Sequence, residues 1–196
     1  MSNVSRIFTA AIGALALGAM AMSQPVEARG PQGPVPGKPG TANIVEIAVA
    51  VNSASGEFSY LLAAATCDDF DGAVVELLTG NEHLTLFAPT DAAFIALQEA
   101  LGVTEPAPEV TCTLPSATVL DILTYHVTEG RRFSNSVFNR NAVKMVKMLN
   151  GQYVITNPDL SLNDIAGQSV GLVPPLFNIN ASNGVVHVID TVLLPF

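Results

Sequence analysis

Three histidines and two cysteines are among the side chains in this sequence that could act as metal ligands, bases or nucleophiles. His83, His126 and His187 lack the HxH or HxxxH spacing that brings two imidazoles to one metal ion. The sequence also has no Gly-x-Ser-x-Gly motif, phosphate-binding glycine loop, dinucleotide fingerprint or HExxH motif. We therefore predict that the protein is not an enzyme and holds no metal or cofactor.

Cys67 and Cys112 form an even pair in a chain with no other cysteine. Such a pair forms a disulfide in an oxidising compartment, whereas a thiol nucleophile or a metal site would be favoured by a CxxC spacing or a nearby histidine. Closing a loop of about 45 residues stabilises the folded state by roughly 4 kcal/mol in the chain-entropy model. We predict a structural disulfide.

Basic residues are confined to one part of the chain. Between Thr41 and Gly130 there is no lysine or arginine, although acidic residues recur from Glu46 to Glu129. Five basic residues then follow closely: Arg131, Arg132, Arg140, Lys144 and Lys147. We expect a bipolar domain whose basic segment binds an acidic polysaccharide, a lipid headgroup or the acidic face of another copy. A solvated surface with internal salt bridges is the alternative, and the net charge of −9 argues against nucleic acid.

The N-terminal region has the pattern of an export signal followed by a spacer. Arg6 and the apolar run after it predict a cleaved signal peptide over residues 1–28, with cleavage after Ser23 or an uncleaved anchor as alternatives. Residues 29–40 are rich in glycine and proline and predict a linker. Residues 41–196 suit one domain. We expect a secreted or periplasmic protein without an integral membrane span after cleavage.

Hydrophobic periodicity predicts helices in the first half of the domain. Apolar residues recur at helical spacing in three segments: 44–51, 58–65 and 74–78. A strand over residues 84–88 ends at Pro89, and Thr90 or Asp91 caps a following helix that Gly102 terminates. After an extended stretch over 107–115, a helix from Ser116 gathers apolar residues and a histidine on one side: Val119, Leu120, Ile122, Leu123 and His126.

The period changes to that of strands after residue 143. Segments 143–149 and 152–156 flank Asn150-Gly151, which predicts a hairpin with a type I′ turn. Alternation along the first of these strands would place Lys144 and Lys147 on opposite faces. Further short strands are expected at three places: 160–162, 169–173 and 185–194.

Two distant segments carry a resemblance to a known family. They are Leu84-Thr-Leu-Phe-Ala-Pro-Thr-Asp-Ala-Ala-Phe94 and Asn183-Gly-Val-Val-His-Val-Ile-Asp-Thr-Val-Leu-Leu-Pro195, with Tyr125-His126 between them. Together they resemble the fasciclin-like (FAS1) domain of secreted adhesion proteins, over about Asn43 to Pro195. The resemblance implies an α+β fold, a wedge-shaped β-sandwich of two sheets with several α-helices packed around it.

The resemblance also implies candidate partner-binding residues. Tyr125-His126 is similar to the tyrosine–histidine motif that has been tied to integrin-dependent adhesion in some animal members, although a histidine near the end of an apolar helix more often bonds a buried carbonyl. Asn178-Ile179 stands where those members carry an Asp-Ile pair. The carboxylate that could ligate a divalent cation at an integrin is therefore absent.

These observations predict an exported adhesion or interaction module of the cell surface or extracellular matrix. It would bind protein or glycan partners without catalysis and could associate weakly with itself. The alternative is a periplasmic protein that binds a small molecule or a lipid. An adhesive domain should keep an exposed apolar or basic patch, whereas a carrier should enclose an apolar cavity.

Overall fold

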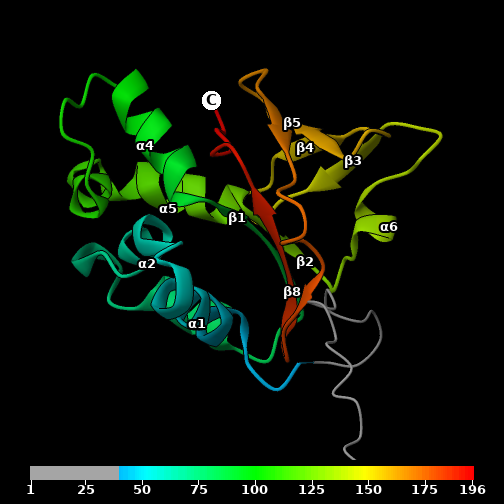
Figure 1. Ribbon diagram of the computed structural model, residues 1–196, viewed down its shortest axis with the longest axis horizontal. Helices are drawn as coiled ribbons and strands as arrows, with labels where there is room; N and C mark the ends of the chain where they lie inside the picture. The colour runs from blue at the N-terminus through cyan, green and yellow to red at the C-terminus, as the bar shows by residue number, and fades with distance from the viewer. Residues whose placement is uncertain (1–39) are drawn as a thin grey trace, which may run out of the picture. The chain divides into compact units, whose positions relative to one another are not determined.

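The computed structural model describes residues 40–196, in which helices come first and most strands follow (Figure 1). The predicted signal peptide over residues 1–28 and the predicted linker up to residue 39 lie outside the described residues and stay predictions. The α-helices are α1 (Ile44–Ser55), α2 (Ser59–Ala65), α3 (Ala73–Thr79), α4 (Asp91–Ala100), α5 (Ser116–Tyr125) and α6 (Ser134–Val137). Two 3-10 helices are η1 (Asp68–Phe70) and η2 (Pro108–Thr113). Within this part of the chain, no helix is long and apolar enough to cross a membrane.

The strands of the described residues form two four-stranded sheets, with the orders β2-β1-β8-β7 and β3-β4-β5-β6. The first sheet consists of β1 (Leu84–Pro89), β2 (Val127–Glu129), β7 (Ile179–Asn180) and β8 (Gly184–Ile189). The second consists of β3 (Lys144–Lys147), β4 (Tyr153–Thr156), β5 (Ser161–Asn163) and β6 (Ser169–Gly171). Helices α1, α2, α4 and α5 lie on one side of β1 and β8, and the second sheet lies on the other (Figure 1).

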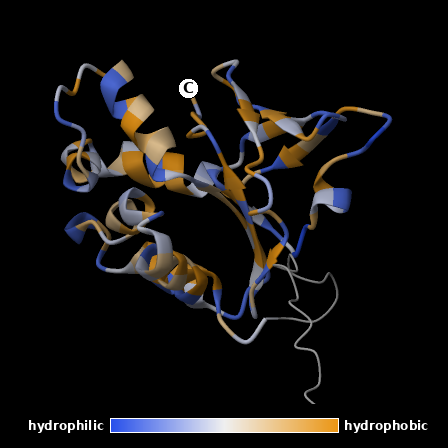
Figure 2. Ribbon diagram, in the orientation of Figure 1, coloured by the Kyte–Doolittle hydropathy of each residue, from blue (hydrophilic) through white to orange (hydrophobic). Residues whose placement is uncertain are grey.

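The parallel pair β1 and β8 forms the centre of the domain. All residues of both strands are buried, as expected for a parallel pair that is covered on both faces. Leu86 and Val186 pack in the core shared with the helices, whereas Phe87 and Ile189 pack against the second sheet. Hydrophobic residues follow the length of β8 in Figure 2. The two motif segments of the sequence therefore supply the strands on which both cores are built.

Short polar side chains hold the helix starts. Asn43 and Glu46 form a reciprocal capping box at α1. Of the two predicted caps of α4, it is Thr90 that accepts a hydrogen bond from the Ala93 amide, at 3.2 Å. Asp91 instead accepts hydrogen bonds from the amides of Ser59 and Tyr60, so that it caps the neighbouring helix α2. Because Asp91 belongs to α4 and caps α2, these hydrogen bonds fix the two helices relative to each other.

The predicted disulfide between Cys67 and Cys112 is confirmed and joins the end of α2 to η2. The prediction of an extended stretch over residues 107–115 is wrong, because Pro108–Thr113 forms η2. Pro108 presets the backbone angle of the first turn, and the Gln98 side chain both donates to and accepts from the Ala107 backbone. These contacts hold the segment in a turn that local periodicity does not reveal.

The structure also differs from the sequence predictions at Leu120 of α5, at the turn of the hairpin and at the end of β8. Leu120 was expected on the buried side of α5 but is 41% exposed. The hairpin between β3 and β4 is present, but among its turn residues only Gly151 has a positive φ, so the turn is not type I′. The Gly151 amide instead donates to the Met148 carbonyl, which makes a longer loop with one left-handed residue. The strand expected over 185–194 ends at Ile189.

Candidate functional site

Tyr125 anchors the second sheet to the helical layer. Its side chain is fully buried, and its hydroxyl donates a hydrogen bond to the Tyr153 carbonyl of β4 at 2.9 Å. The same oxygen accepts a hydrogen bond from the Ile165 amide at 3.1 Å. Both hydrogen-bonding roles of the hydroxyl are thus used inside the domain.

His126 is also enclosed, at the junction between α5 and β2. Its Nδ1 donates to the Ile122 carbonyl at 2.7 Å, and its Nε2 accepts a hydrogen bond from the Leu193 amide at 2.9 Å. Burial lowers the pKa of His126 to about 4, so the imidazole is neutral near pH 7. The tyrosine–histidine pair is therefore placed as an internal clamp, out of reach of a macromolecule in this conformation.

His187 and Asn178 form a second internal clamp, between β8 and α6. His187 donates from Nε2 to the Arg132 carbonyl at 2.8 Å and accepts at Nδ1 from the Asn178 amide at 3.3 Å. Burial lowers the pKa of His187 as well. The Asn178 side chain accepts from the Ser134 amide at 2.6 Å and donates to the Ser134 hydroxyl at 2.9 Å. Ile179 lies half-buried in β7 beside it.

Three of the five basic residues make hydrogen bonds within the domain. The Arg131 guanidinium donates to the carbonyls of Ala181 and Ser182, at 2.9 and 3.0 Å, and to the side chain of Asn180. The others are the Arg132 Nε, which donates to the Glu129 carbonyl, and the Lys144 ammonium, which donates to the Ser136 carbonyl. The side chains of Arg140 and Lys147 are exposed.

Each of the two remaining cations of the basic segment, Arg140 and Lys147, lines a surface groove. The first, which we call the Arg140 groove, has a volume of about 350 Å³ and combines Arg140 with polar and apolar groups: Ser134, Asn135, Phe138, Pro158, Leu160 and Phe177. The second, the Lys147 groove, has a volume of about 290 Å³ and is lined by Thr128, Glu129, Arg132, Lys147, Met148, Leu149 and Gly151. The basic segment thus supplies cations to two grooves.

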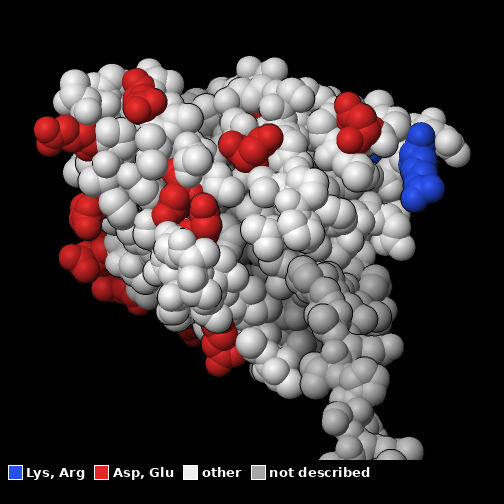
Figure 3. All heavy atoms as spheres, in the orientation of Figure 1, with Lys and Arg blue, Asp and Glu red and all other residues white. Residues whose placement is uncertain are grey.

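Charge and apolar surface are both distributed unevenly. Residues 41–130 contain thirteen acidic side chains and no basic one. In Figure 3 most of the visible acidic groups are scattered over the helical side, and a basic group appears at the opposite edge with one acidic group beside it. Beside Lys147, the outer face of the β3–β4 hairpin exposes Met145, Tyr153 and Ile155, by 66, 47 and 38%. Lys144 is half-buried and Lys147 exposed, in agreement with the predicted alternation.

The domain is α+β, its two motif strands β1 and β8 are buried, and two shallow grooves are lined by Arg140 and by Arg132 and Lys147. In the described residues, no group of three or more histidine, cysteine or acidic side chains is arranged to hold a metal ion. The sequence profile of the Fasciclin domain matches residues 58–195, and the chain belongs to this family. Its fold is the α+β FAS1 fold, and the family is one of cell-adhesion-type modules that are generally non-catalytic.

Relatives of the chain occur in a cyanobacterium. Protein sll1483 of Synechocystis sp. is 30% identical over 158 residues, which cover 78% of this chain and 73% of the relative. The uncharacterized protein sll1735 of the same organism is 32% identical over 152 residues, covering 78% of this chain and 97% of the relative. A solved FAS1 domain pair from the insect cell adhesion molecule Fasciclin I aligns with a TM-score of 0.45 at 18% identity. The alignment covers 68% of this chain and 43% of that structure, so this chain spans less than half of it.

The cations of the two grooves are recognisable in the sequence, but the residues that surround them are not. Asn135, Leu160 and Phe177 come from three separate segments and meet only in the folded chain. Phe177 belongs to an apolar stretch ahead of β7, which was the one local signal available. Asn135 and Leu160 lie in segments without a local sequence pattern that marks a binding site.

Proposed function

We propose that this protein is an exported, non-catalytic adhesion module that holds an acidic polysaccharide through the Arg140 and Lys147 grooves. The observation that carries the proposal is the separation of charge along the chain, because residues 41–130 carry thirteen acidic side chains and no basic one, whereas residues 131–196 carry five basic and three acidic side chains. Family membership supports the adhesive role.

The chemistry of the Arg140 groove suits a charged sugar. Arginine presents a planar fork of donors that matches a carboxylate or a sulfate. Asn135 offers an amide to sugar hydroxyls, and Leu160, Pro158 and Phe177 offer apolar surface to the carbon faces of a ring. A single groove would bind weakly, so a polymer that engages both grooves or several copies gains affinity through effective concentration.

The test compares retention of the purified protein on immobilised heparin and on neutral dextran. We expect retention on heparin alone, and we expect the double variant Arg140→Glu/Lys147→Glu to lose at least tenfold in affinity. The double variant Arg29→Glu/Lys38→Glu is the matched control, because it changes the net charge equally but outside the described residues. An equal loss of heparin affinity in both double variants would show that binding depends only on net charge and would overturn the role of the grooves. Equal retention on dextran would overturn the proposal of an acidic ligand.

A further inference from the structure

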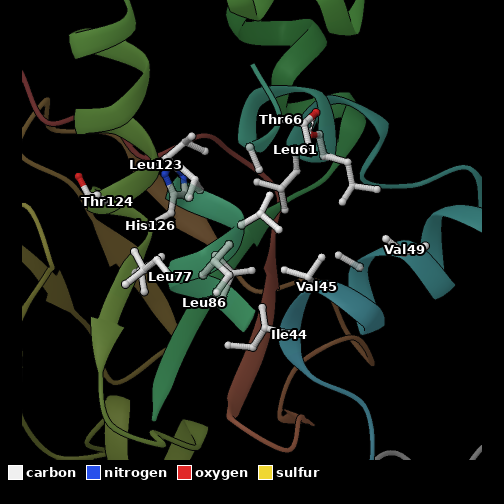
Figure 4. Close-up of a pocket in the computed structure, with 17 residues that line it drawn as sticks. Ile44, Val45, Val49, Leu61, Thr66, Leu77, Leu86, Leu123, Thr124 and His126 are labelled. Atoms are coloured by element: carbon white, nitrogen blue, oxygen red, sulfur yellow. Dashed lines mark hydrogen bonds between the residues drawn. The ribbon is translucent and has the colours of Figure 1, made fainter. Parts of the chain in front are cut away.

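An apolar pocket lies between the helices, away from both grooves. Helices α1, α2, α3 and α5 surround it, and residues of β1 and β2 also line it (Figure 4). Its volume is about 150 Å³, and fourteen of its seventeen lining residues are aliphatic. Leu86 and Leu61 are buried within it, whereas Val49 is 46% exposed and Thr66 is exposed at its rim. The pocket is thus closed at one end and accessible to solvent at the other.

The three polar residues of the lining have their hydrogen bonds committed elsewhere. The Thr66 hydroxyl donates to the Leu62 carbonyl at 2.8 Å, and the Thr124 hydroxyl donates to the Leu120 carbonyl at 2.7 Å. Both nitrogens of His126 bond backbone groups. Among the lining side chains, a polar ligand group would find no free donor and only the Thr66 and Thr124 hydroxyl oxygens as acceptors, so the pocket favours hydrocarbon.

Small side chains create the space. Ala48 of α1 and Ala65 of α2 are both buried in the lining, where a leucine would fill the volume. An unfilled apolar space weakens a core because its lining atoms lack contacts on one side. Dry apolar cavities of about 150 Å³ bind molecules of the size of benzene. The end of a slender hydrocarbon chain therefore fits the pocket.

The negative charge near the open end of the pocket limits which headgroup such a ligand can carry. Two exposed carboxylates, Asp68 and Asp69 on η1, follow the rim residue Thr66 closely in the chain. Glu46 on α1 and Glu76 on α3 are also exposed, on the helix faces turned away from the lining residues. No basic residue occurs between Thr41 and Gly130 to offset them. An anionic headgroup at the rim would be repelled, whereas a neutral one would not.

We propose that this pocket is a binding site for the hydrocarbon chain of a neutral-headed amphiphile, such as a fatty alcohol or a monoacylglycerol. The chain end lies against Leu86, Leu61 and Leu123, and the uncharged head stays at the rim near Val49 and Thr66. This site is independent of the proposed polysaccharide function, because it uses none of the cations.

The experiment titrates the protein with decanol and with decanoate near pH 7, following the melting temperature and the methyl NMR signals of leucine and methionine. We expect decanol to raise the melting temperature and to shift the signals of Leu86 and Leu123, with the exposed Met145 methyl as the control for non-specific adsorption. Decanoate, which has the same chain and a negative head, should bind at least tenfold more weakly. Titrations with monoacylglycerol and with zwitterionic phospholipid vesicles then show whether the ligand is a free amphiphile or a lipid held in a membrane.

Variants that fill the pocket provide the decisive comparison. Ala48→Leu should abolish the response to decanol, while Ala50→Leu on the exposed side of the same helix should leave it unchanged. Ala65→Leu fills the space from α2 and replaces Ala48→Leu if the latter does not fold. No response of the parent to decanol, or a full response in a folded pocket-filled variant, would overturn the site. Equal affinity for decanoate would refute the selection for a neutral head.

Discussion

His126 makes the stability of the domain depend on pH in a defined direction. Its pKa is about 4 in the folded protein and 6.5 in an ordinary exposed histidine, because burial disfavours the charged ring. Between these values the unfolded chain binds the proton and the folded chain does not, so acid favours unfolding. We expect the free energy of unfolding to fall by about 2 kcal/mol from pH 7 to pH 5, with a further loss from His187.

Urea unfolding at a series of pH values measures this dependence. The variant His126→Gln should be less stable than the parent at pH 7 and should show a shallower loss towards pH 5. A parent whose stability is constant over this range would show that the buried ring is not held neutral.

Arg131 and Arg140 have the same side chain and different tasks. Arg131 bonds the backbone carbonyls of Ala181 and Ser182, whereas Arg140 is exposed in its groove. We expect Arg131→Ala to lower the free energy of unfolding by about 2 kcal/mol and Arg140→Ala to change it by less than about 0.5 kcal/mol. Chemical denaturation checks both values, and a similar loss in the two variants would contradict this assignment of roles.

At the level of elements, the contact between β1 and β8 leaves no room for a side chain at Gly184. A methyl group there would lie 2.2 Å from the Leu84 carbonyl oxygen and 2.7 Å from the Ile44 side chain. Gly184→Ala should therefore force the central strands apart and cost about 3 kcal/mol or more. Gly80→Ala, where the closest atom is 3.3 Å away, is the control with a small expected effect. Near-equal melting temperatures of these variants would refute the tight contact.

The disulfide restrains η2, whose residues show no local helical pattern in the sequence. We expect the double variant Cys67→Ser/Cys112→Ser to lose about 4 kcal/mol of stability if the entropy of the unfolded chain is the main contribution. Amide hydrogen exchange should rise first in η2 and at the end of α2, next to the broken link. Loss of protection spread evenly over both sheets would contradict a local role.

Helices and strands that have a clear local sequence pattern could be predicted. Elements that form only through tertiary contacts could not. Helices α1 to α5 and the hairpin follow from periodicity and turn residues. The short strands β2 and β7 have too few residues for a period and exist because β1 and β8 offer edges to pair with. The grooves and the helical pocket were not predictable, because their linings come from distant segments.

Across the whole molecule, charge and apolar space are divided between two layers. The helical layer contains the apolar pocket and belongs to residues 41–130, which carry thirteen acidic side chains and no basic one. The cations of the described residues follow Gly130: Lys144 and Lys147 lie on β3 and Arg140 precedes it, whereas Arg131 and Arg132 lie beside the first sheet. An anionic polymer is therefore attracted to one side and repelled from the other, which orients the domain on the polymer.

The dependence of the heparin dissociation constant on salt concentration is the sharpest test of binding through the two grooves. We predict that the dissociation constant for heparin rises steeply with sodium chloride concentration, and that Arg140→Glu/Lys147→Glu weakens binding and flattens this dependence while Arg29→Glu/Lys38→Glu does not. An affinity for heparin that does not change with salt, or that survives the reversal of both groove charges, would contradict the central claim that these grooves hold an acidic polysaccharide.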